Sequence, residues 1–115
     1  MPEVFDLGEP VLAYEQWQQE WESVRLMCGK GWYASPGGFM SEGSDRGPRA
    51  YYIVRGTFAL GDVVLGPGHL ILYAAGEPMR LGMRGQDGGE HFGVYGAGLS
   101  SVMVQRFIDS VNGTA

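Results

Sequence analysis

Residues able to carry acid, base or metal chemistry are few in this sequence, and they are scattered. The two histidines are His69, which follows a Pro-Gly pair, and His91, which follows Glu90. With Glu42, Asp45 or Glu90 they could form a metal site, but zinc and related ions are bound by three or four ligands with supporting contacts, and this spacing predicts no such set. We therefore interpret both histidines as surface or turn residues, and we expect neither a metal nor another cofactor.

Nucleophilic catalysis has no support in the sequence either. No Gly-x-Ser-x-Gly elbow occurs, and Cys28, the single cysteine, is interpreted as a small buried hydrophobic residue at the end of an apolar helix face. The glycine-rich run at 93–98 lacks the lysine of a phosphate-binding loop. A single cysteine forms no internal disulfide, which favours a reducing compartment, so we expect the protein in the cytoplasm.

Length and composition predict one domain over residues 1–115. Apolar residues make up 44% of the chain, which is enough for a core, and 20 glycines indicate many tight turns. The net charge is −5 with no basic stripe, so nucleic acid is not an expected partner. No apolar run approaches the ~20 residues that span a bilayer, so no membrane association is expected.

An amphipathic helix is predicted over residues 10–28. Its apolar face is formed by residues at alternating steps of three and four, namely Tyr14, Trp17, Trp21, Val24 and Cys28. A shorter helix followed by a strand at Val24–Met27 is the alternative. A face with two indoles must cover the barrel or pack on a second copy, and the need to protect sheet edges favours a homodimer.

From residue 31 to 105 the sequence predicts a small β-barrel or sandwich. Short β-branched and aromatic segments alternate with turn residues at a spacing of roughly ten. A short helix and polar tail are expected over 106–115. The predicted strands are Trp32–Ala34, Phe39–Met40, Ala50–Val54, Thr57–Leu60, Asp62–Leu65, His69–Tyr73, Met79–Met83, His91–Tyr95 and Ser101–Val104.

The stretch from Arg49 to Met83 resembles the cupin family, whose two motifs form consecutive hairpins of a jelly-roll barrel and contribute metal ligands to its interior. Arg49 stands seven residues before Gly56, at the place of the glutamate ligand in the first motif. The glycine, proline, glycine, histidine and asparagine positions of the second motif are occupied by Gly68, Ala74, Gly76, Met79 and Met83. The resemblance covers about a third of the chain and implies a jelly-roll fold.

The ligand positions of the family carry other chemistry in this chain. Arg49 and Met79 occupy two of them, and no histidine lies at residues 42–45, where the first motif has its pair. A guanidinium does not bind a divalent cation, and a thioether is a weak ligand for Zn, Fe or Mn. The resemblance therefore implies a barrel without the family's metal.

The resemblance also implies that Arg49, Tyr51, Met79 and Met83 face the barrel mouth, where they would bind a ligand. Tyr95 joins them from an aromatic set that could stack on a planar ligand or fill the core. The full set is Trp32, Tyr33, Phe39, Tyr51, Tyr52, Tyr73 and Tyr95.

An inward-facing arginine needs a negative partner. For Arg49 this is either a carboxylate of the chain, from Glu42, Asp45 or Glu90, or an anionic ligand such as a carboxylate or phosphate, and both alternatives stay open.

Three functions follow from this interpretation. The preferred one is a metal-independent, non-catalytic binding protein for a small anionic molecule. The second is a metal-free isomerase, epimerase or lyase of the cupin type, in which His69 or His91 would work with Tyr51 or Tyr95. The third is an interaction module, such as a small inhibitor or accessory subunit, which would present a large exposed apolar patch to a protein partner.

Overall fold

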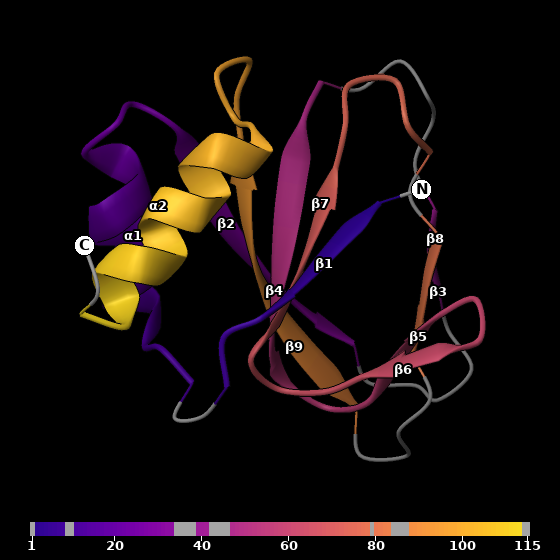
Figure 1. Ribbon diagram of the computed structural model, residues 1–115. Helices are drawn as coiled ribbons and strands as arrows, with labels where there is room; N and C mark the ends of the chain where they lie inside the picture. Colours follow the sequence, from indigo (N-terminus) through magenta and orange to yellow (C-terminus); the bar gives the residue numbers. More distant parts are fainter. Residues whose placement is uncertain are drawn as a thin grey trace.

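The computed structural model describes residues 2–8, 11–33, 39–41, 47–78, 80–83 and 88–113, with the backbone alone at 32–33, 39–41, 80–81 and 83. Within these residues the chain is mainly β-structure with two helices (Figure 1). The elements are β1 (Glu3–Asp6), α1 (Tyr14–Glu22), β2 (Met27–Tyr33), β3 (Phe39–Ser41), β4 (Arg49–Arg55), β5 (Phe58–Leu60), β6 (Val63–Leu65), β7 (His69–Tyr73), β8 (Arg80–Met83), β9 (Gly89–Tyr95) and α2 (Ser101–Val111).

The strands form two antiparallel sheets. The larger has the order β1-β7-β4-β9-β2 and the smaller the order β3-β8-β5-β6. Figure 1 shows both helices on one side of the larger sheet and the smaller sheet on the other. No strand pairing joins the two sheets within the described residues. The mainly β fold is confirmed, while closure into a jelly-roll barrel stays a prediction.

Strict alternation along the central strands separates two apolar clusters. In β4, Ala50 and Tyr52 belong to the cluster beneath the helices, and Tyr51 and Ile53 belong to the cluster between the sheets. Successive side chains of a strand point to opposite faces, so one seven-residue strand supplies both layers. A run of apolar residues without polar alternation fits a strand buried on both faces.

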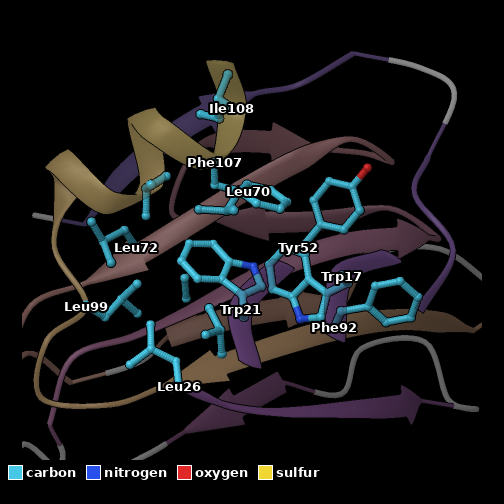
Figure 2. Close-up of a cluster of buried hydrophobic side chains, with 13 residues drawn as sticks. Trp17, Trp21, Leu26, Tyr52, Leu70, Leu72, Phe92, Leu99, Phe107 and Ile108 are labelled. Carbon is cyan, nitrogen blue, oxygen red and sulfur yellow. The ribbon is translucent and has the colours of Figure 1, made fainter. Parts of the chain in front are cut away.

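The cluster beneath the helices is rich in aromatic rings (Figure 2). Trp17 stacks on Tyr52 with ring centroids 5.3 Å apart, and Trp21 stacks on Phe107 at 4.8 Å. The Trp17 indole N–H donates to the Gly93 carbonyl oxygen at 2.9 Å, which ties α1 to β9. The two indoles of the expected apolar face are thus buried on the outer face of the larger sheet, while Val24 of that face is exposed.

Helix α1 is shorter than the expected span of 10–28, which was wrong at both ends. Arg25 adopts a left-handed conformation with φ of 64°, and the Leu26 N–H then donates back to the Trp21 carbonyl oxygen at 3.1 Å. This is a Schellman-type termination, which releases the chain into β2. The alternative of a shorter helix followed by a strand has the right order of elements, but its strand bounds of Val24–Met27 are wrong: the strand starts at Met27 and contains Gly29 and Gly31.

The predicted strand Ser101–Val104 is also wrong, because these residues begin α2. Ser100 has an extended backbone, and its hydroxyl oxygen accepts a hydrogen bond from the Met103 N–H at 3.4 Å. This N-cap starts the helix five residues before the expected 106. The four-residue spacing of Leu99, Met103, Phe107 and Val111 had indicated the helix but not its start.

Most predicted strands are confirmed within one or two residues, and His69–Tyr73 is confirmed at both ends. Strand β1 was missed, because Glu3–Asp6 is short and largely exposed. It pairs antiparallel with β7, from Glu3 opposite Leu72 to Asp6 opposite His69. No described helix is long and apolar enough to cross a membrane.

Candidate functional site

The inner face of the larger sheet, which looks toward the smaller sheet, carries a layer of polar and aromatic side chains. The alternation that puts Tyr51 of β4 between the sheets does the same for Tyr73 of β7. Tyr51 contacts His91 and Tyr95 of β9, with ring centroids 5.2 and 6.1 Å away. We call this set the inner layer; its members are Arg49, Tyr51, Tyr73, His91 and Tyr95.

Arg49 is buried at one end of the inner layer, with 1% of its surface exposed. Its guanidinium donates to the carbonyl oxygen of Ala74 at 3.1 Å and to that of Glu77, both in the segment after β7. It also lies 5.0 Å from the centre of the Tyr73 ring, a cation–π geometry. Arg49 therefore anchors the connection between β7 and β8 to the start of β4.

The structure separates Arg49 from one of the three carboxylates expected as its partner. Glu90 lies opposite Arg55 in the pairing of β4 with β9, at the other end of β4 from Arg49. Glu42 and Asp45 lie outside the described residues. Backbone carbonyls are instead the described acceptors of Arg49, and sequence reasoning missed them because every residue type carries one.

Glu77 lies beside this anchor. Burial opposes ionisation of its carboxyl group, but the hydrogen bond from the Ala74 N–H, 3.0 Å long, and nearby positive charge, of which Arg49 is one source, together lower the pKa of Glu77 below its usual value. Two sets of hydrogen bonds therefore hold the segment from Ala74 to Glu77. Arg49 donates to the carbonyl oxygens of both residues, and the Ala74 N–H donates to the Glu77 carboxylate.

His91 is the clearest disagreement with the sequence interpretation, because it is not a surface residue. It is 4% exposed, and its ring meets Tyr51 edge to face. Gly31 stands directly opposite His91 in β2, and a Cβ atom added there would lie 2.5 Å from the imidazole Cε1. The ring therefore occupies the space that a side chain at residue 31 would fill, and this glycine in a strand was the available signal.

The Tyr95 ring also occupies space next to glycines. A Cβ atom added to Gly93 would lie 2.5 Å from the Tyr95 hydroxyl oxygen, and one added to Gly29 would lie 3.8 Å from its ring. The tyrosine ring therefore folds back over two glycines of neighbouring strands. Gly31 on β2 and Gly93 on β9 thus make room for one imidazole and one phenol, whereas a Cβ atom at Gly29 would be in ordinary contact.

A cavity of about 450 Å³ opens at the Arg49 end of the inner layer. Its wall includes Arg49, Tyr95 and Met27, and Met27 is 74% exposed. The remaining wall is the backbone-rich set Gly47, Pro48, Gly96 and Ala97. Among the described residues that line it, Arg49 is the one charged side chain. Volumes of this size suit small metabolites.

Two of the five predicted ligand-binding residues cannot be placed. Met79 lies outside the described residues, as does the side chain of Met83. Arg49 and Tyr95 line the cavity, and Tyr51 lies behind Tyr95 in the inner layer. The Trp32, Tyr33 and Phe39 side chains of the aromatic set are likewise outside the described part.

His69 is the first residue of β7 and closes the turn that precedes it, and its partly exposed side chain agrees with the expectation. Its Nδ1 lies 2.9 Å from the Gly66 carbonyl oxygen, and its Nε2 lies 3.8 Å from the Asp6 carboxylate on β1. It is separated from Tyr73 by the length of β7. The described residues contain no group of three His, Cys, Asp or Glu side chains placed to hold a metal ion.

Cys28 lies in β2 rather than at a helix end. Burial raises the pKa of its thiol to about 11, and the Glu22 carboxylate adds to the shift. A thiol with such a pKa is almost fully protonated at neutral pH, which makes it a poor nucleophile. This protonated thiol agrees with the interpretation of Cys28 as a packing residue.

No protein-family model matches the chain, and no curated protein matches it. The inner layer and its cavity are therefore interpreted on their own chemistry.

Proposed function

We propose that the protein is a metal-independent, non-catalytic binding protein for a small anionic molecule, which enters the cavity next to Arg49. The proposal includes a jelly-roll arrangement of the cupin type for the two sheets and residence in the cytoplasm. The observation that carries it is the wall of the 450 Å³ cavity, in which Arg49 is the one charged side chain among the described residues.

The electrostatics of this wall favour an anion. Carbonyl groups hold the guanidinium in one orientation, and a buried guanidinium attracts a carboxylate or phosphate more strongly than one in water does. Glu77, whose carboxylate would oppose an anion, lines a different hollow together with Glu3 and Ser100. Tyr95 and the exposed Met27 add apolar surface for the body of the ligand.

Native mass spectrometry of freshly purified protein tests the proposal first, because it reports a retained small molecule and a bound metal together. Calorimetric titration with inorganic phosphate, acetate and citrate then measures anion binding, with glucose as a neutral control. We expect Arg49→Met to weaken anion binding at least about tenfold.

The matched control is Arg55→Met, which removes an exposed arginine from the far end of the same strand. Arg49→Lys keeps the charge but loses the forked geometry, so intermediate binding is expected from a variant that stays folded. Equal anion affinities of the wild-type protein and a folded Arg49→Met variant would contradict the proposal.

A second candidate function is a metal-free isomerase, epimerase or lyase, and the buried His91 favours it. Acid–base catalysis needs a titratable group shielded from water, and the His91–Tyr51 pair meets that need. Incubation with sugar nucleotides in D2O tests it: deuterium incorporation at carbon that is lost in His91→Gln would support catalysis. Absence of exchange with the wild-type protein would leave binding as the better function.

A further inference from the structure

A shallow groove between the two helices lies on the side of the molecule away from the inner layer (Figure 1). Its floor is the stacked pair of Trp21 and Phe107, whose rings are 4.8 Å apart. Glu20 and Val24 line it from α1 and the turn that follows, and Arg106 lines it from α2. The volume is about 160 Å³, too small for most ligands but suited to one or two inserted side chains.

The surroundings of the groove are apolar and accessible. Val24 is 49% exposed at one rim, and Val102 is 60% exposed one helical turn before Arg106. Met103, also in the lining, is only partly buried. Exposed aliphatic side chains over an aromatic floor are typical of a surface that another protein covers.

The two charges of the groove have opposite signs and come from different helices. Glu20 and Arg106 form no ion pair with each other or with another described residue. A patch that carries one acid and one base complements itself, because a two-fold axis places the acid of each copy against the base of the other. A partner of single charge would meet one favourable and one unfavourable group.

We propose that this groove is a homodimer interface, in which a second copy of the chain packs across α1 and α2. In each half, Glu20 of one protomer pairs with Arg106 of its partner, and Val24 and Val102 are buried between them. This inference does not depend on ligand binding, because the cavity at Arg49 lies on the opposite side of the larger sheet from the helices.

Sedimentation velocity of the unliganded full chain over a range of concentrations tests the inference. We expect a concentration-dependent dimer. Glu20→Arg and Arg106→Glu should each weaken dimerisation at least about tenfold, since both copies of the contact become repulsive. The double variant should return to near the wild-type dissociation constant, because the swapped charges again attract across the axis.

Glu15→Arg, on the same helix but outside the groove lining, is the matched control and should leave the dimer intact. Val24→Asp should also give monomer, and circular dichroism checks that each variant is folded. A wild-type protein that stays monomeric, a dimer insensitive to both charge reversals, or a folded double variant that fails to recover would each overturn the inference. None of these results would affect anion binding at Arg49.

Discussion

At the scale of single residues, the glycines of β2 and β9 explain how polar rings fit between the sheets. Gly31 is required by the imidazole of His91, and Gly93 is required by the phenol of Tyr95. Glycine in a strand lowers stability, and the packing of the two buried rings offsets this loss at Gly31 and Gly93. Arg49 lies at one end of the layer and donates a hydrogen bond to the Ala74 carbonyl oxygen in the segment after β7.

Gly31→Ala should destabilise the fold by about 1–3 kcal/mol, because the new methyl group overlaps the buried imidazole. Chemical denaturation measures the change. In an His91→Ala background the same substitution should cost much less, since the overlapping ring is gone, and the difference is the coupling free energy of the pair. Equal costs in both backgrounds would show that the imidazole does not occupy this space.

Glu77 makes stability depend on acid pH. Its pKa is lower in the folded chain than the usual value of 4.5, so its ionised form stabilises the fold above that pH, and this contribution is lost as the pH falls through the folded pKa. In Glu77→Gln the free energy of unfolding should therefore fall less between about pH 5 and pH 3 than in the wild-type protein. If the free energy of unfolding depends on pH in the same way in both proteins, the Glu77 carboxylate does not stabilise the fold as described.

At the scale of elements, helix ends decide the course of the chain. Arg25 holds a left-handed conformation that L residues other than glycine adopt at a cost, yet it completes the termination of α1 and turns the chain into β2. Ser100 starts α2, because its hydroxyl oxygen accepts a hydrogen bond from the Met103 N–H. Both ends are single-residue features with apolar residues close by on either side, so the spacing of apolar residues did not mark them.

Arg25→Gly should stabilise the protein by about 0.5–1 kcal/mol, because glycine adopts positive φ without the Cβ penalty. Thermal unfolding measures the effect. Arg25→Ala is the control: it removes the same side chain but keeps the Cβ atom, so no stabilisation is expected from it. A stabilised Arg25→Ala variant would show that the arginine side chain, rather than the positive φ, lowers the stability of the wild-type protein.

At the scale of the whole molecule, the larger sheet is the shared wall of two cores. Its outer face is covered by both helices, and its inner face meets the smaller sheet. Trp17 lies at the junction, because its ring packs among Tyr52, Phe92 and Phe107 while its N–H bonds to Gly93 of β9. Helices and sheet should therefore unfold together.

Trp17→Phe should lower the stability by about 1–3 kcal/mol, since it leaves a small void and removes the donor to the Gly93 carbonyl. Tryptophan fluorescence and far-UV circular dichroism should report coincident transitions in both proteins. Val63→Ala, at an exposed position of β6 away from both helices, is the control and should have little effect. Separate transitions for the two probes would show that the helices fold independently of the sheet.

The sequence by itself determined the class of the fold and most of its strands. Short segments of β-branched and aromatic residues and well-spaced turn residues are local properties, so His69–Tyr73 and its neighbours could be placed from them. The inward position of Arg49 was expected from the resemblance of residues 49–83 to the cupin motifs. These features depend on residues close in the chain.

Only the tertiary structure decided which distant residues meet. The burial of His91 depends on Gly31, sixty residues earlier in the chain, and the anchoring of Arg49 depends on the carbonyl groups of Ala74 and Glu77. Strand pairing brings such groups together across long separations, and a backbone carbonyl or an absent side chain leaves no distinctive mark in the sequence. The candidate site therefore became visible only when the strands were in register.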